Sequence, residues 1–228
     1  MHSPIKKAVI DARSPEDTLI LHFSTVHLRD DSRIRSKMMA SLQARYPGQV
    51  KLLVQDGLGN ETDKEGYPVI DTGPRLKRIR RMTLGGWRMF RAVLRERPKI
   101  AHFHDPELIP WAMLLSLFGI KIVYDIHEDY PEAVSENYQL PWVARKVLPP
   151  VVRLVEGVCS PFFSAFVTVT PQIQQRFSRS KTVMVRNWPI AREFHEPSDQ
   201  PMSDRPREVV YIGTINLNRN ILGMLDVA

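Results

Sequence analysis

The chain has 228 residues, of which 43% are hydrophobic and 25% are charged, and its formal net charge is +7. This composition excludes a disordered or collagen-like protein and is typical of a chain with a buried core. The single cysteine, Cys159, excludes an internal disulfide and gives no sign of an oxidising compartment. The sequence shows no secretory signal and no uncharged apolar run long enough to span a bilayer. We therefore expect a cytoplasmic protein, with attachment to a membrane surface left open.

Short β-rich runs alternate with helix-length segments along most of the chain. We expect strands over residues 18–24, 50–55, 69–70, 100–104, 121–126, 165–170 and 182–186, and helices over 34–46, 87–97, 108–118 and 171–177. This order builds βαβ units, so the sequence predicts an α/β fold, a Rossmann-like parallel sheet with helices on both faces. Ligands of such sheets bind at the carboxyl ends of the strands, so the residues just after each strand are the candidates for function.

Positive charge is concentrated in residues 75–99, where ten basic residues stand against one acid, Glu96. An anionic partner is expected from such a patch: phospholipid headgroups, a lipid diphosphate or nucleic acid. The chain has no recognisable single-strand stacking motif or zinc framework, so nucleic acid is not expected. Within the patch, one helix face carries Arg88, Arg91 and Arg95 beside an apolar stripe. We interpret these arginines as a membrane-surface contact, with a solvated helix face as the alternative.

Two predicted strands end in polar clusters, and the loop after the first strand is polar as well. That first loop contains His27, Asp31 and Arg33, which are available to hydroxyls or phosphates, although capping of the next helix accounts equally well for Asp31. The fourth strand ends in His102-Phe-His-Asp-Pro-Glu-Leu108, in which Asp105 can cap a helix that begins at Pro106. This pattern is weak support for a metal site, and an imidazole beside a helix N-terminus better suits a phosphate.

The fifth strand ends in Tyr124-Asp-Ile-His-Glu-Asp-Tyr-Pro-Glu132, where four carboxylates surround one histidine. So many carboxylates at the end of a buried strand exceed what solubility requires. Further on, residues 189–206 are rich in proline and polar residues, which is typical of an extended connector. A strand over 208–212, a turn at Gly213 and a partial helix from Asn220 follow, and they are too short to bury a core of their own. We expect a first domain over 1–188, a linker over 189–206 and the truncated start of a second domain over 207–228.

Five motifs together resemble the family 4 retaining glycosyltransferases of the GT-B fold. They are, in chain order, Asp31-Ser-Arg-Ile34, His102-Phe-His-Asp-Pro-Glu-Leu108, Val123-Tyr-Asp-Ile-His-Glu128, Val185-Arg-Asn-Trp-Pro189, and Tyr211-Ile-Gly-Thr214 with Arg219-Asn-Ile221. The resemblance implies an N-terminal acceptor domain followed by the start of the donor domain. The family's paired glutamates, which hold the donor, are absent, so we expect this chain to be inactive alone. The glycine-rich first loop of many family members is also replaced in this chain, by Ser24-Thr-Val-His-Leu28.

The resemblance further implies transfer of a sugar from a nucleotide-sugar to an acceptor hydroxyl, with retained configuration and without a metal or other cofactor. A sugar or lipid-linked acceptor in cell-surface polysaccharide or glycolipid synthesis is expected. By the same resemblance, His104 is catalytic and Asp105 orients it or caps the helix. The acceptor side is expected to comprise His27, Asp31, Arg33, Asp125, His127 and Glu128. The donor side is expected to comprise Gly213, Thr214 and Arg219.

Two other functions remain open at this point. A chain of this kind could be a non-catalytic accessory subunit that binds the acceptor, or a sugar-nucleotide epimerase on the same fold. His104 and Asp125 also have a purely structural interpretation, as satisfied groups of the core.

Overall fold

The computed structural model describes residues 18–190, 201–206, 208, 210–213, 215 and 220–226. The chain divides into two compact units, Met1–Trp188 and Pro189–Ala228. The expected linker and second-domain boundaries remain predictions.

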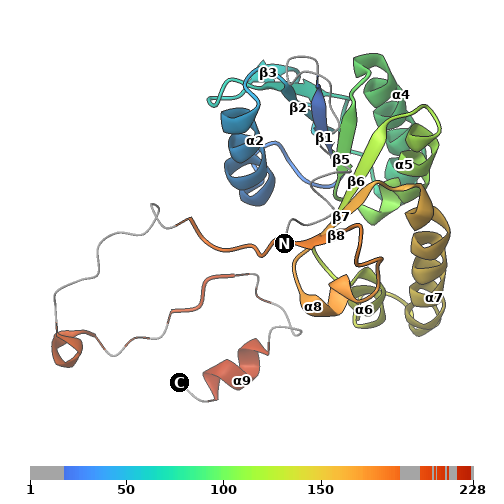
Figure 1. Ribbon diagram of the computed structural model, residues 1–228. Coiled ribbons are helices and arrows are strands. Elements are labelled where there is room, and N and C mark those ends of the chain that lie inside the picture. The colour runs from blue at the N-terminus through green and yellow to red at the C-terminus, as the bar shows by residue number, and fades with distance from the viewer. Residues whose placement is uncertain are drawn as a thin grey trace. The chain divides into compact units, whose positions relative to one another are not determined.

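The first unit is built on an eight-stranded sheet with the order β3-β4-β2-β1-β5-β6-β7-β8 (Figure 1). Neighbouring strands are parallel, except for the antiparallel pair β3–β4. This is the mostly parallel α/β architecture that the sequence predicted, and the fold class is confirmed. The strands are β1 (Ile20–Phe23), β2 (Val50–Val54), β3 (Glu61–Thr62), β4 (Pro68–Asp71), β5 (Ile100–Phe103), β6 (Lys121–Ile126), β7 (Ala165–Thr168) and β8 (Thr182–Met184).

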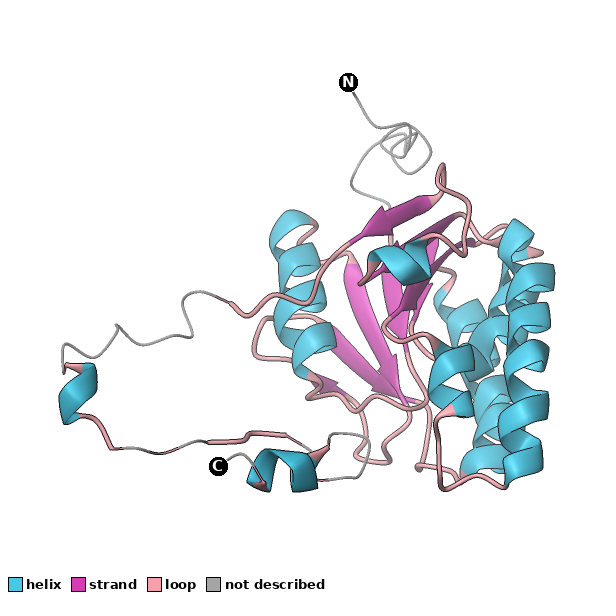
Figure 2. Ribbon diagram, turned by 90° about the horizontal axis from the view of Figure 1, so that it is seen from below, coloured by secondary structure: helices cyan, strands magenta, loops and turns pink. Residues whose placement is uncertain are grey.

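Helices cover both faces of the sheet (Figure 2). On one face, α4 (Gly86–Glu96) and α5 (Ile109–Ser116) pack on the main core, to which the strands contribute Phe23 and Phe103. On the other face, the π-helical turns Arg33–Met39 lead into α2 (Ala40–Arg45) and pack on β2. Strands covered on both faces must be apolar nearly throughout, and all four residues of β1 are buried.

The remaining helical segments are short, apart from one. They are α3 (Arg78–Arg80), the π-helical turns Arg81–Gly85, the 3₁₀ turns Pro106–Leu108, Ser160–Phe162 and Met202–Asp204, and the helices α6 (Tyr130–Ser135), α7 (Trp142–Cys159), α8 (Pro171–Gln174) and α9 (Ile221–Leu225). No helix in the part of the chain that the structure describes is both long enough and apolar enough to cross a membrane.

Several predicted elements differ from the observed ones. The helix expected over 87–97 begins earlier, because α3 and the turns Arg81–Gly85 run directly into α4. The strand expected over 208–212 is wrong for its described residues, which are irregular. A single strand is not stable without a neighbour to pair with, which accounts for this difference. The helices α6 and α7 and the strand β3 were not predicted, and α7 contains Pro149 and Pro150, which normally oppose a helix.

Candidate active site

The candidate site lies at the carboxyl ends of three neighbouring strands. Strand β1 pairs with β5, and β5 pairs with β6, in a register that places His22 opposite His102 and Phe103 opposite Tyr124. The polar residues that follow β5 therefore lie beside the polar end of β6. Strand order thus brings together groups from residues 22–33, 102–105 and 125–127, which are far apart in the sequence.

Asp125 is the centre of this cluster. Its side chain is fully buried, and the guanidinium of Arg33 donates from Nη2 to Oδ1 over 3.1 Å. Oδ2 lies 3.4 Å from Nδ1 of His104 and 3.0 Å from Nε2 of His127. Burial alone would raise the pKa of Asp125, but hydrogen bonds with His104 and His127 outweigh burial and hold this pKa well below its ordinary value. Asp125 is therefore an ionised carboxylate inside the protein.

His104 is bound at both ring nitrogens. Because the Asp125 carboxylate only accepts, the proton on His104 lies on Nδ1, and Nε2 accepts from Nδ1 of His22 over 3.3 Å. The ring is fully buried, and burial lowers the pKa of His104 despite the nearby carboxylate. In this arrangement His104 is a neutral link between His22 and Asp125. The structural interpretation accounts for these contacts, and the catalytic role of His104 remains a prediction.

His127 has three competing neighbours at one nitrogen, and Nδ1 of His104 is one of them, 3.2 Å from Nε2. Nε of Arg33 points at His127 Nε2 from 3.1 Å, while the Asp125 carboxylate lies 3.0 Å from the same atom. A lone pair on Nε2 accepts from Arg33, whereas a proton on Nε2 is donated to Asp125. The His127 side chain is 13% exposed, in contrast to that of His104. His127 can therefore meet both Asp125 and a ligand, and His102, which is 12% exposed and lies 3.7 Å from Asp125, shares this property.

His27 and Asp31 form a second pair at the exposed edge of the cluster. Nδ1 of His27 lies 2.8 Å from Oδ2 of Asp31, and their side chains are 25% and 27% exposed. Burial lowers the pKa of His27, but the hydrogen bond to Asp31 and the nearby Asp105 carboxylate raise it above its ordinary value overall. The same hydrogen bond is the main reason that the pKa of Asp31 falls to about 2. Oδ1 of Asp31 also accepts from the amides of Arg33 and Ile34, which confirms that Asp31 caps the helix.

Asp105 shapes the first loop and does not cap the helix after it. Its side chain makes no capping bond within the described residues, so that part of the prediction is wrong. Instead, Oδ2 accepts from the amide of Thr25 over 2.6 Å, the hydroxyl of Ser24 over 2.8 Å and the amide of Val26 over 3.2 Å. To accept these bonds, the Asp105 carboxylate must point away from the helical turn that begins at Pro106. Asp105 thus fixes the loop that carries His27.

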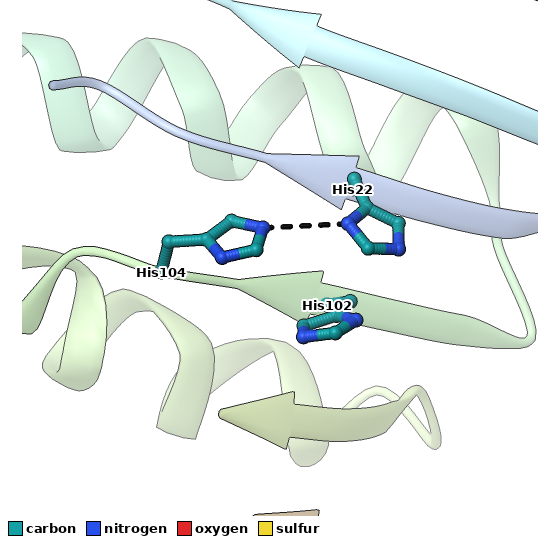
Figure 3. Close-up of side chains that lie close together, drawn as sticks. All are labelled: His22, His102 and His104. Atoms are coloured by element: carbon teal, nitrogen blue, oxygen red, sulfur yellow. Dashed lines mark hydrogen bonds between the residues drawn. The ribbon is translucent and has the colours of Figure 1, made fainter. Parts of the chain in front are cut away.

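Three histidines gather on one face of the sheet, and Figure 3 shows Nδ1 of His22 facing Nε2 of His104 with His102 beside them. Burial lowers the pKa of His102 to about 3 and that of His22 well below its ordinary value, so both rings are neutral. Candidate ligand nitrogens of the three rings lie within 4.8 Å of one another. Neutral imidazoles are good ligands for zinc. A metal ion bound there would break the hydrogen bond between His22 and His104 and would be repelled by the positive charge of Arg33. The metal-free reaction remains a prediction.

A cavity of about 360 Å³ opens beside these histidines. Its positively charged lining comes from Arg33, Lys37 and Arg186, and no carboxylate is among its described lining residues. Arg33 is neutralised by Asp125, and Lys37 donates to Oδ1 of Asn187 over 2.6 Å. Met38, Leu42, Val167 and Val185 also line it, so the cavity combines an apolar wall with the positive charge of Arg186.

The other predicted site residues lie apart from this cluster. Glu128 is exposed and makes none of the hydrogen bonds of the cluster described above. Arg88, Arg91 and Arg95 line a separate cavity of about 360 Å³ between α4 and β4, together with Asp71 and Glu96. Their membrane contact remains a prediction. Gly213 belongs to the second unit, whereas Thr214 and Arg219 lie outside the described residues.

Comparison with known proteins bears on the identity of this domain. Residues 34–191 match the family model of the glycosyl transferase 4-like domain, and this range holds most of the cluster around Asp125. The chain belongs to this glycosyltransferase family. No curated protein is significantly similar to the chain.

Solved structures support the fold of this glycosyltransferase domain. A sucrose-phosphate synthase from Thermosynechococcus elongatus is similar with a TM-score of 0.56 and 12% identity, over 74% of this chain and 48% of that one. A second structure of that protein, a twinned crystal form whose name gives the ranges 27–220 and 406–426, matches with a TM-score of 0.50 and 11% identity, over 74% and 88%. The chain thus spans about half the length of the longer structure. The likeness shows a GT-B-type N-terminal fold.

Sequence reasoning missed part of the candidate site. His22 lies in the middle of β1, and only residues that follow a strand were considered as candidates. It joins the network because β1 pairs with β5 in a register that places His22 opposite His102. Tyr130 was not singled out either, although its hydroxyl donates to the carbonyl of His104 over 3.1 Å. Alternation gave one usable signal: His22 stands between the core residues Leu21 and Phe23, so it must face the other side of the sheet.

Proposed function

We propose that this domain binds the acceptor in an enzyme that transfers a sugar from a nucleotide-sugar to an acceptor hydroxyl, with retained configuration. The observation that carries this proposal is the ionised Asp125, buried between Arg33 and the histidines at the carboxyl ends of the strands. A buried charge of this kind is expensive to maintain, and such groups cluster at functional sites. Membership of a glycosyltransferase family supplies the reaction class.

His127 receives the proton of the acceptor hydroxyl in this proposal. When His127 donates from Nε2 to Asp125, its Nδ1 carries a lone pair and is free to bind a hydroxyl. Proton transfer to Nδ1 creates an imidazolium, which the Asp125 carboxylate stabilises at 3.0 Å. Arg33 holds the alternative state, in which Nε2 is an acceptor.

His27 supplies positive charge beside His127. Its raised pKa favours the imidazolium, and its ring centroid lies 5.5 Å from that of His127. A cation at this position stabilises the charge that develops on the leaving diphosphate. Together with Arg33, His27 supports transfer without a divalent metal. Donor contacts are assigned to Gly213, Thr214 and Arg219, and the acceptor is a sugar or lipid-linked sugar of cell-surface polysaccharide or glycolipid synthesis.

The proposal is tested in two steps. First, the imidazole resonances of isotope-labelled protein are followed by NMR during titration with nucleotide-sugars and with sugar acceptors. Acceptors should shift the signals of His27 and His127, and a panel in which neither signal moves would contradict an acceptor site at this edge.

Turnover is then measured with the complete gene product by mass spectrometry of the glycosylated acceptor. We expect His127→Gln to reduce transfer by a factor of roughly 10² to 10⁴, with thermal stability retained. The matched control Glu132→Gln, an exposed carboxyl on α6, should leave transfer unchanged. Equal transfer by His127→Gln and wild type would remove the proposed base. Conversion of a nucleotide-sugar without any acceptor would instead indicate an epimerase, and acceptor binding without turnover an accessory subunit.

A further inference from the structure

The helix α7 exposes an apolar stripe along its length. Five side chains recur at intervals of four, four, three and four residues, which places them on one helical face: Val143, Val147, Val151, Leu154 and Val158. Each of them is between 46% and 66% exposed. Trp142, which is 64% exposed, stands at the N-terminal end of this stripe. We call these six side chains the α7 stripe.

The α7 stripe is not needed for packing of the domain. Of the 18 residues of α7, only Glu156 and Cys159 are buried, and they lie on the side that faces the protein. An amphipathic helix on a soluble domain normally turns its apolar face inward. Here the outward face is apolar over the whole helix. A contiguous exposed patch of this kind marks a contact surface.

The charges around the α7 stripe indicate what covers it. Lys146 and Arg153 are exposed beside the stripe, whereas Arg145 lies on the inward face, over the ring of Tyr138. The one carboxylate of the helix, that of Glu156, is turned inward and paired with Arg176. Nζ of Lys146 lies 5.2 Å from the ring centroid of Trp142. Basic side chains with long apolar stems can keep their charge in water while valine and leucine side chains are immersed in lipid. An apolar stripe flanked by cations matches an anionic bilayer, which supplies both acyl chains and negative headgroups.

We propose that α7 lies in the interface of an anionic membrane, with the α7 stripe among the acyl chains and Lys146 and Arg153 at the headgroups. This surface is distinct from the arginines of α4, and the proposal does not depend on the transferase chemistry. It gives the domain two signals for attachment, apolar burial and charge. Neither signal alone holds a protein firmly on a membrane.

Co-sedimentation with lipid vesicles tests the proposal on the full chain. Vesicles of phosphatidylcholine alone are compared with vesicles that contain about one third phosphatidylglycerol, at low and at physiological salt. We expect binding to the anionic vesicles, and a decrease of at least about tenfold in the variant Val151→Asp/Leu154→Asp. The matched control Leu58→Asp changes a side chain that is 73% exposed on another part of the domain, and it should bind as wild type does. Circular dichroism and thermal melting verify that each variant is folded.

A charge variant separates the two signals. Lys146→Glu/Arg153→Glu should bind anionic vesicles more weakly and lose most of the salt dependence. If Val151→Asp/Leu154→Asp binds the vesicles as tightly as wild type does, or if wild type does not bind them, the proposal is overturned. Loss of binding only in Arg88→Ser/Arg91→Ser/Arg95→Ser would assign the contact to α4 and overturn it as well. A dimer in sedimentation velocity that Val151→Asp dissociates, without vesicle binding, would assign the α7 stripe to a contact between copies of the chain.

Discussion

Replacing Asp125 with asparagine keeps the shape of the side chain and removes its charge. Asp125 is fully buried and the side chain of Arg33 is 10% exposed, so Asp125→Asn leaves a guanidinium without its counter-charge inside the protein. Removing one partner of a buried pair costs about 3 to 5 kcal/mol. The amide oxygen of asparagine can still accept one hydrogen bond from Arg33, so the lower end of this range applies. For a domain of this size, about 3 kcal/mol corresponds to a fall in Tm of roughly 6 to 12 °C.

The measurement is a double-mutant cycle between Arg33 and Asp125. Urea and thermal unfolding at pH 7 give the free energy of unfolding for wild type, Asp125→Asn, Arg33→Met and the double variant. Because methionine removes the cation that Asp125→Asn strands, the double variant should be more stable than the sum of the single effects predicts, by about 1.5 kcal/mol or more. Additive effects, or a cost of less than about 1 kcal/mol for Asp125→Asn, would refute the view that this ion pair organises the site.

Three further predictions concern titration and packing. The pKa of His27, followed by NMR, should lie above its ordinary value and fall in Asp31→Asn, because the variant removes the carboxylate that stabilises the imidazolium. Burial raises the pKa of Glu156 from 4.5 to about 7, against the opposing charge of Arg176. The folded chain therefore keeps a proton that the unfolded chain releases, so the free energy of unfolding should fall as the pH rises from 4.5 to 7, and Glu156→Gln should flatten this slope. Gly86→Ala should cost about 1 to 3 kcal/mol in urea unfolding, because a Cβ at this position overlaps the indole of Trp111.

Each of these predictions has a control or a contradicting result. An unchanged pKa of His27 in Asp31→Asn would mean that another group sets it. The same pH dependence of stability in wild type and Glu156→Gln would assign the titration elsewhere. For the glycine, the control is Gly157→Ala, since a Cβ at Gly157 in α7 meets nothing within 4 Å. We expect that control to be neutral or stabilising by up to about 1 kcal/mol. Equal costs at Gly86 and Gly157 would contradict a packing role for Gly86.

Local pattern sufficed for the sheet because buried parallel strands are short apolar runs bounded by turns. The strand predicted over 121–126 is β6, residue for residue, and the other predicted strands of the first unit differ from the observed ones by one or two residues at their ends, whereas the two-residue β3 was missed. The helix α7 was missed because Pro149 and Pro150 signal a break locally, yet the helix continues through both. Tertiary contacts with α5 and α6 override that signal.

The site was foreseen only in part, for a physical reason. Strand ends pointed to Arg33, His104, Asp125 and His127, and these residues do meet. Their bonding partners, however, depend on which strands are neighbours, and that order is not local information. Asp105 shows the difference: its position before Pro106 favours a helix cap, but its carboxylate bonds the backbone of Thr25, 80 residues away. The buried link through His22 has the same origin.

The alternation along β1 and β5 has a consequence for how this domain can change. Odd-numbered positions such as Phe23 and Phe103 fill the core under α4 and α5, while His22 and His102 face the opposite side and build the polar network. One short stretch of chain therefore encodes stability and chemistry on separate, interleaved positions. Substitutions at the even positions can retune ligand preference with little loss of the hydrophobic core. A shift of β1 by a single residue against β5 would exchange the two sets at once, so selection for a stable core also preserves the alignment of the site.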